Sequence, residues 1–346
     1  MDLSGVTRRV VVPLPVDPQG LRGPRPGAAR GPRWRASSHG FRVPSSVDGS
    51  TVDQRVVEAA AALPQEWGGV TGWAALGWMG STWFDGTPWG GGRTRPVTLA
   101  IGGNRWSRQQ RFFATSEERL APRDLVMVDG VRVTTAVRST WFEMRYARDA
   151  RDAAIALSMA CFHDAVSIDE VLAYGANLRG WTGMPKAREA IPLATENAWS
   201  PREVGMGHVW VLDAELPPPL YNVPVFDLEG NHIGTPDLLD PRSGVFGQYD
   251  GALHLTRSRR EKDVDRDEAF RSHGLEGAIM VAGDVADPTA FIRRLKAAYD
   301  RAADRPPHHR RWTVERPEGW IETTTVAGRR ALSSALRARL LAHRIA

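Results

Sequence analysis

The sequence predicts an α/β domain in its C-terminal half, preceded by a mainly helical region that starts with a winged-helix-like arrangement. Three observations predict this class. The chain has 346 residues, enough for two or three domains; helical periodicity dominates residues 136–193; and strand and helix signals alternate over residues 195–305. We therefore predict five segments: 1–50, a flexible basic arm; 51–135, a winged-helix-like domain; 136–194, a helical connector; 195–305, the α/β domain; and 306–346, a basic C-terminal tail or helix.

The N-terminal segments are predicted from composition and periodicity. Residues 13–35 consist mainly of Pro, Gly and Arg, a composition that buries too little apolar surface to offset the entropy of ordering. Asp129-Gly130 between two alternating runs is a strong hairpin signal. The predicted elements are a helix over 52–63, a short helix over about 71–79, a strand over 96–101 and a hairpin over 124–134. This order is typical of a winged helix.

Four helices are expected in the connector, over 136–147, 149–162, 167–178 and 183–193. Cys161 falls in the apolar stripe of the second of them, so we assign it to the core and not to a nucleophile. Because Cys161 is the one cysteine of the chain, the sequence excludes a disulfide within the chain and a zinc site built on paired cysteines.

The α/β domain is expected to begin with a capping box, Ser200 to Glu203, in front of a helix over 201–213. Three strands joined by tight turns then form an antiparallel meander. A polar helix that ends at Gly274, a strand and an amphipathic helix follow, which gives the order α-β-β-β-α-β-α. The expected strands are 222–228, 232–240 and 245–255 in the meander and 275–284 after it.

Acidic and polar side chains of the meander are expected to converge. Because side chains alternate along a strand, Gln248 and Asp250 point the same way, and Asp237 lies on the preceding antiparallel strand, level with them. Glu203 approaches from the helix, and His254 lies four residues beyond Asp250. Oxygen ligands of this kind suit a Mg²⁺ or Mn²⁺ site for phosphodiester hydrolysis, with His254 as a proton shuttle.

These residues carry a family resemblance. TPDLLD, then QYDGALH, then KDVDRDEAFRSHGLE resemble the PD-(D/E)XK restriction-endonuclease-like superfamily, and most closely its very-short-patch-repair (Vsr-like) branch. The resemblance covers residues 195–305. It implies a restriction-endonuclease-like fold and Mg²⁺-dependent DNA cleavage. The matching positions are Asp237, Gln248, Asp250, His254 and the run from Asp263 to Asp267.

One position departs from this family. An acid is expected where the chain has Gln248, and a neutral amide is a poor ligand for Mg²⁺. Three alternatives remain open: a weakened but working site, a protein that keeps the fold without catalysis, or a glutamine engineered to disable cleavage.

The N-terminal part resembles the AbiEi-like antitoxins of type IV abortive-infection systems, over 52–80 and from 130 to 181. This resemblance implies DNA binding through a recognition helix near 71–79 and a hairpin wing at 124–134. The apolar, tryptophan-rich character of that helix argues against reading of base edges. The alternative function is therefore a non-catalytic, antitoxin-like transcriptional regulator, with a toxin or a DNA methyltransferase as possible protein partner.

The charge distribution favours a polyanionic partner such as DNA. The net charge is +5; residues 1–35 carry +5 and residues 305–346 carry +6, so the stretch between them carries −6. The basic cluster beyond His254 is interpreted equally as a solvated helix face or as phosphate contacts. Trp83, Trp89 and Trp106 are loop candidates for base stacking. The predicted nucleic-acid contacts are Arg257, Arg259, Arg260, Lys262, Arg310 and Arg311, with Arg329, Arg330, Arg337 and Arg339 as a further phosphate-tracking set. The stretch 331–342 is expected as an amphipathic helix, which could instead dock on the body of the protein or on a partner.

Each proposed site residue also has a structural explanation. Helix capping alone explains Glu203, a turn or strand end explains Asp237, a bulge explains Asp250, and a surface or core position explains His254.

No apolar run approaches the length of about 18–20 residues that a membrane span needs, so we expect a cytoplasmic protein without a membrane partner.

Overall fold

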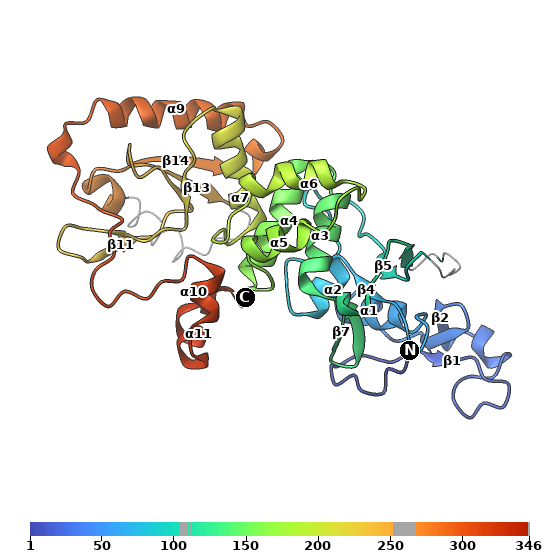
Figure 1. The fold of residues 1–346 in the computed structure, drawn as a ribbon. Helices are drawn as coiled ribbons and strands as arrows, with labels where there is room; N and C mark the ends of the chain where they lie inside the picture. The colour runs from blue at the N-terminus through green and yellow to red at the C-terminus, as the bar shows by residue number, and fades with distance from the viewer. Residues whose placement is uncertain (104–109, 111–112, 252–267, 345–346) are drawn as a thin grey trace. The chain divides into compact units, whose positions relative to one another are not determined.

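The computed structural model describes residues 1–103, 110, 113–251 and 268–344. The chain forms two compact units, which we describe separately (Figure 1). The first comprises Met1–Arg148 and Asp169–Ala187, and the second comprises Asp149–Ile168 and Arg188–Ala346. The segment predicted as a helical connector is therefore shared between the two units. Its four predicted helices are present as α3 (Ala136–Tyr146), α4 (Ala150–Phe162), α5 (Ile168–Gly175) and α6 (Met184–Ala190).

The first unit is built on a five-stranded mixed sheet in the order β6-β5-β4-β8-β7. The β4/β8 and β5/β6 pairs are parallel, and the other pairs are antiparallel. Two of these strands, β4 and β6, were not expected from the sequence. The strands are β4 (Gly69–Thr71), β5 (Val97–Ala100), β6 (Phe113–Ser116), β7 (Leu125–Val128) and β8 (Val131–Thr134), and the helices before and between them are α1 (Val52–Ala60) and α2 (Trp73–Trp78).

The predicted hairpin is present, whereas the predicted recognition helix is a core helix. Asp129 and Gly130 have φ values of 43° and 73°, the two positive angles that a type I′ turn between β7 and β8 requires. In α2, Trp73 is 2% exposed, and Leu76 and Trp78 are 0% exposed. A helix enclosed in this way cannot present its side chains to a DNA groove, so the recognition role expected for residues 71–79 is corrected.

Residues 1–50, predicted as a flexible arm, instead contain a small antiparallel sheet in the order β1-β3-β2. Buried polar anchors account for the difference. Both terminal nitrogens of Arg35 donate to the carboxylate of Glu58, at 2.7 and 2.6 Å. The Gln54 side chain pairs with both backbone groups of Val11. The three strands are β1 (Leu14–Pro15), β2 (Trp34–Ser38) and β3 (Phe41–Pro44).

The second unit contains a four-stranded mixed sheet in the order β14-β13-β12-β9. The β13/β14 pair is parallel, and the other two pairs are antiparallel. The first two predicted strands are each broken at a proline, Pro224 and Pro236, because proline has no N–H to donate to the ladder. The bounds are β9 (Leu220–Tyr221), β10 (Val225–Phe226), β11 (His232–Gly234), β12 (Leu238–Leu239), β13 (Val245–Asp250) and β14 (Glu276–Val281), with β10 and β11 forming a separate ladder.

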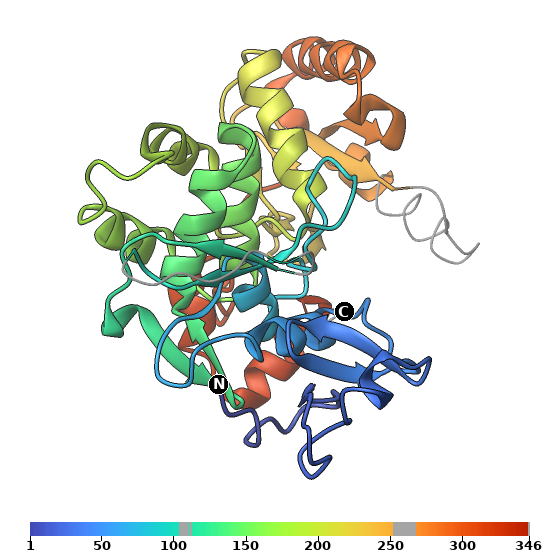
Figure 2. The same cartoon turned by 90° about the vertical axis from the view of Figure 1, so that its right-hand side faces the viewer.

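Two apolar clusters cover the two faces of this sheet. On one face, α7 (Pro201–His208), the π-helical turn Val209–Asp213 and α9 (Thr289–Ala303) pack on alternate strand residues. Figures 1 and 2 show α9 running beside β14. The other face is closed around Phe246 and Trp312. Gln248 and Asp250 share the face of Phe246, because they are two and four residues further along β13.

The polar helix predicted before Gly274 is described only over 268–272. Gly274 has a φ of +94°, and a Cβ there would lie 2.3 Å from the carbonyl oxygen of His309. Glycine is therefore required at this helix end, as the sequence suggested. The preceding part of that helix prediction lies outside the described residues.

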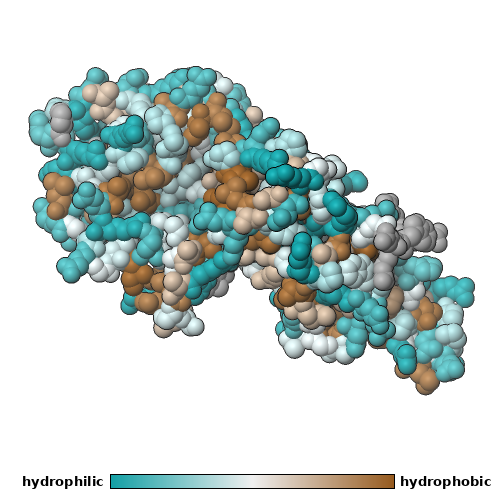
Figure 3. Space-filling view, viewed as in Figure 1, coloured by the Kyte–Doolittle hydropathy of each residue, from teal (hydrophilic) through white to brown (hydrophobic). Residues whose placement is uncertain are grey.

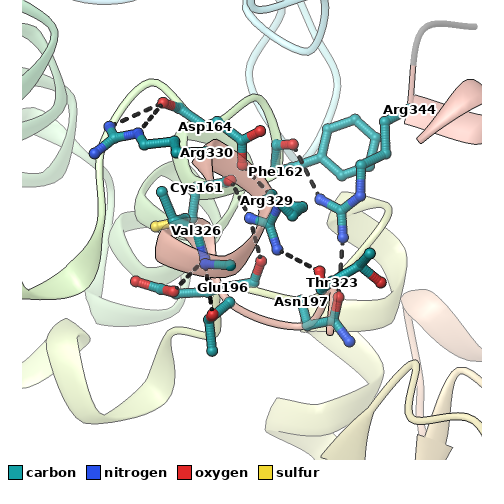
Figure 4. Close-up of polar contacts among 12 residues, drawn as sticks. Cys161, Phe162, Asp164, Glu196, Asn197, Thr323, Val326, Arg329, Arg330 and Arg344 are labelled. Carbon is teal, nitrogen blue, oxygen red and sulfur yellow. Dashed lines mark hydrogen bonds and ion pairs between the residues drawn. The ribbon is translucent and has the colours of Figure 1, made fainter. Parts of the chain in front are cut away.

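The C-terminal segment, expected to be a phosphate-tracking tail, is docked on the end of α4. Arg329 is 0% exposed; its Nε donates to Asp164 Oδ1 at 2.6 Å and its Nη2 donates to the Cys161 carbonyl at 2.7 Å. Arg330 and Arg337 also donate to Asp164. Figure 4 shows the contacts of Arg329 and Arg330 around α10 (Val326–Arg330), which precedes α11 (Ser334–Leu340). Backbone carbonyls at and just beyond the end of α4, together with the Asp164 carboxylate, thus engage three of the four arginines of that set.

Cys161 is fully buried, and burial raises the pKa of its thiol, which agrees with its assignment to the core.

Within the described ranges no helix has the length and apolar character needed to cross a membrane. On the face drawn in Figure 3, hydrophilic residues are interspersed with small apolar patches.

Replacing Asp164 by Asn tests the docking of the C-terminal segment. Asp164 has a φ of 57°, which Asn also tolerates, so Asp164→Asn removes the charge without adding backbone strain. Breaking a buried ion pair in this way should lower the free energy of unfolding by about 3 kcal/mol, measured by urea denaturation of the full chain. Arg339→Ala, at an exposed position of α11, is the control and should change it by less than about 0.5 kcal/mol. Equal stabilities of the two variants would contradict the docking.

Candidate functional site

The register of β12 and β13 places Asp237 opposite Gln248. Leu238 pairs with Gly247, so the next positions outward along the antiparallel ladder are Asp237 and Gln248. The backbone N–H of Tyr249 donates to Asp237 Oδ2 at 2.7 Å, which fixes this carboxylate to the neighbouring strand. Gln248 is 8% exposed, and Asp237 and Asp250 are half-buried. The structure therefore brings these three predicted residues to one face at one end of the sheet.

Glu203 lies in the first turn of α7 and is 8% exposed. The Ser200 hydroxyl accepts a hydrogen bond from the Glu203 N–H at 3.2 Å and donates one to Glu203 Oε1 at 2.9 Å. The Trp199 N–H donates to Glu203 Oε2 at 2.7 Å. The hydrogen bonds that the helix-cap interpretation of Glu203 requires are thus present. The same carboxylate also belongs to the buried cluster around Asp237.

Asn222, which no motif in the sequence indicated, connects these two acids. Its Nδ2 donates to Glu203 Oε2 at 2.6 Å, and its backbone N–H donates to the Asp237 carbonyl at 3.0 Å. Its φ is 46°, a left-handed conformation that Asn adopts more readily than most residues. Its Oδ1 is buried and has no hydrogen-bond partner among the described residues. An asparagine two residues before a proline is too common a turn signal to have revealed this role.

A second buried amide supports Asn222 from behind. Asn197 Nδ2 donates to the carbonyls of Tyr221 and Asn222, at 2.7 and 3.1 Å. Its Oδ1 accepts a hydrogen bond from Arg344 Nη2 at 2.9 Å (Figure 4). Burial, and next the charge of Arg329, lower the pKa of Arg344 to about 9. A continuous set of buried hydrogen bonds therefore joins the docked C-terminal segment to Glu203.

The electrostatics of the cluster show that the two acids are close. Burial raises the pKa of Glu203 to about 7, and the negative charge of Asp237 contributes to this increase. Two nearby carboxylates cannot both ionise without cost. Near neutral pH, Glu203 is therefore divided between its protonated and ionised forms.

The remaining predicted site residues are placed differently. Arg310 is exposed; its Nη2 donates to the Pro241 carbonyl at 3.0 Å, and its guanidinium carbon lies 4.1 Å from the centre of a Trp312 ring. Arg311 is exposed and donates to the Ser272 carbonyl at 2.7 Å. Trp83 is 36% exposed, and Trp89 packs edge-on against Phe84. The predicted residues that lie outside the described ranges are Trp106, His254, Arg257, Arg259, Arg260, Lys262 and the run 263–267.

The donors of the cluster have the chemistry that Mg²⁺ prefers, since they are carboxylate and amide oxygens. Within the part of the chain that the structure describes, no group of three or more His, Cys, Asp or Glu is placed to hold a metal ion. Asp237 and Asp250 are the two half-buried acids, Gln248 is neutral, and both Glu203 oxygens already accept hydrogen bonds. Any bound cation would therefore take two carboxylates from this cluster and complete its shell with amide oxygens or water.

Comparison of the chain with protein-family models, curated proteins and solved structures gave no match.

The raised pKa of Glu203 predicts how stability changes with pH. Its ordinary value of 4.5 is raised to about 7 in the folded chain, so between these values the folded state binds more protons than the unfolded state. The contribution of Glu203 to the free energy of unfolding should be greatest below about pH 4.5 and lost as the pH rises through 7.

Glu203→Gln is the matched variant, because its amide can keep an oxygen toward Asn222 and Trp199 and an NH₂ toward Ser200. The free energy of unfolding of this variant should fall less than that of the unchanged chain between pH 5 and 8, measured by urea denaturation. Parallel pH profiles would show that Glu203 is not buried beside a second charge.

Proposed function

We propose that the α/β domain of the second unit is a Mg²⁺-dependent DNA endonuclease of the restriction-endonuclease-like class. The observation that carries the proposal is that Asp237, Gln248 and Asp250 lie on one face at one end of a mixed sheet, with Glu203 of α7 near Asp237. The sheet order, with a parallel pair beside an antiparallel pair and α7 and α9 on one face, supports this fold class. The residues 195–305 that resemble the Vsr-like branch include all four side chains.

In this proposal Asp237 and Asp250 would hold the metal ion, and Gln248 would add a weaker amide oxygen. The ion would neutralise a phosphate oxygen and lower the pKa of an attacking water. The chain's own contribution is orientation. Tyr249 fixes the Asp237 carboxylate, Asn222 fixes its backbone, and Glu203 holds Asn222. His254, proposed from the sequence, would move the proton.

Phosphate contacts are proposed for the exposed basic residues of this unit. Arg310 and Arg311 keep exposed guanidinium groups while they donate to backbone carbonyls, so their charges can still attract phosphate. Arg257, Arg259, Arg260 and Lys262 complete the proposed set. In the first unit, the β7–β8 hairpin remains the proposed DNA wing, since Met127 is 57% exposed.

The alternative proposal is a regulator that binds DNA without cleaving it. Gln248 favours this alternative, because it replaces a negative charge at the centre of the cluster by a neutral amide. The two proposals share the fold and the DNA partner and differ only in catalysis, so a cleavage assay separates them.

Two substitutions at the cluster test the proposed catalysis. Plasmid and linear DNA are incubated with the full-length protein and Mg²⁺ or Mn²⁺. Gln248→Glu supplies an acidic ligand and should raise the cleavage rate by at least about tenfold. Asp237→Asn removes a proposed metal ligand and should lower the rate by at least about tenfold, since loss of even an outer-shell residue of a metal site typically costs that much. The control is Glu229→Gln, at an exposed turn of the same unit, which should leave the rate unchanged.

Intact DNA with both the unchanged protein and Gln248→Glu would contradict the endonuclease proposal and leave the regulator.

DNA binding itself is tested by titration at 50 and 200 mM salt. The affinity should fall as the salt concentration rises, because cations compete with the basic side chains of the protein for the phosphates. An affinity independent of salt would contradict both proposals.

A further inference from the structure

The first unit contains a cavity that the proposed nuclease site does not use. It has a volume of about 830 Å³, within the range of about 300–1,000 Å³ typical of small-molecule sites. Its walls come from the segments before β4 and after β5, from the loop that leads into β7, and from the end of α5 and the turn beyond it. Three aromatic side chains line it, Trp67, Tyr174 and Trp181.

The aromatic side chains are held in place by neighbouring groups. Trp67 Nε1 donates to the Ile101 carbonyl at 2.9 Å. The Tyr174 hydroxyl donates to Asp124 Oδ1 at 3.0 Å, and Asp124 is 7% exposed. The guanidinium carbon of Arg138 lies 4.6 Å from the centre of a Trp181 ring. The aromatic wall is therefore fixed before any ligand arrives, which lowers the entropy lost on binding.

The wall also carries excess positive charge. Arg119 and Arg123 line the cavity, are exposed, and form no ion pair with a carboxylate of the described residues. Behind Trp181, the buried Arg138 and Arg145 share one carboxylate, Glu118, at 3.5 and 2.6 Å. The Nε atoms of both buried arginines have no hydrogen-bond partner in the described part of the chain. A ligand that carries an anionic group would be favoured beside such a wall.

We propose that this cavity binds a nucleotide unit, with its base packed on the aromatic wall and its phosphate on Arg119 and Arg123. Aromatic rings beside arginines are the combination that holds unstacked bases in other proteins. The exposed side chain of Asn177, also at the wall, offers an amide donor and an acceptor to a base edge. The ligand is a free mononucleotide or an unpaired base within a strand, which share this chemistry.

The test uses the full-length protein and calorimetric titration with AMP, GMP, CMP and TMP, with the matching nucleosides, and with a short single-stranded DNA and its duplex. At least one mononucleotide or the single strand should bind. The matching nucleoside should bind at least about tenfold more weakly than the mononucleotide, and the cavity variants should leave the affinity for the duplex, which the second unit is proposed to bind, unchanged. Arg119→Ala, Arg123→Ala and Asn177→Ala, all at exposed positions that should not affect folding, should each weaken binding by about threefold or more. The control is Arg179→Ala, which removes the same charge from an exposed position that does not line the cavity.

Mononucleotide binding identifies a free nucleotide as the ligand, and binding of the single strand alone identifies an unpaired base; either supports the proposal. No binding of any nucleotide or single strand would overturn it. Equal weakening by Arg179→Ala, or equal weakening of duplex and single-strand binding by Arg119→Ala, would also overturn it, because both indicate unspecific attraction to the basic surface. Asp237→Asn should leave binding here unchanged, so failure of the nuclease proposal is distinguishable from failure of this one.

Discussion

The candidate site depends on the buried hydrogen bond from Asn222 Nδ2 to Glu203 Oε2, which is 2.6 Å long. This contact joins the first turn of α7 to the residue that follows β9, and the backbone N–H of the same residue donates to the Asp237 carbonyl. Burying the Glu203 carboxylate without such donors would lower the stability of the fold. The hydrogen bond also offsets the energetic cost of the left-handed backbone conformation of Asn222. The register of the sheet then places Asp237 opposite Gln248, because Leu238 pairs with Gly247 and these are the next two positions along the antiparallel strands.

The same physical rule governs the arginine-rich C-terminus. Buried guanidinium groups need several acceptors, and the end of α4 supplies backbone carbonyls that point away from the helix body. Arg329 and Arg344 use these carbonyls together with Asp164 and Asn197. A net charge of +5 therefore overstates the basic surface of the chain, because part of its arginine is structural. The exposed Arg310 and Arg311 remain the better candidates for phosphate contacts.

Local signals in the sequence predicted the elements well and the long-range packing poorly. The hairpin at Asp129, the helices of residues 136–193 and the cap at Ser200 follow from turn chemistry, periodicity and capping, which are all local. The burial of α2 and the ordering of residues 1–50 depend on partners distant in sequence, such as Glu58 for Arg35. Asn222 was missed for the same reason, because nothing beside it indicates that its amide reaches a helix start 19 residues earlier.

The central proposal is that Asp237 and Asp250 form a cation site that Glu203 and Asn222 hold in place. The most direct measurement is a crystal structure of the full-length protein grown with Mn²⁺, with anomalous data collected at the manganese edge. We expect an anomalous peak between the carboxylates of Asp237 and Asp250 in the unchanged protein, and no peak there in Asp237→Asn. The same two carboxylates without an anomalous peak at saturating Mn²⁺, in both the unchanged protein and Gln248→Glu, would contradict the claim.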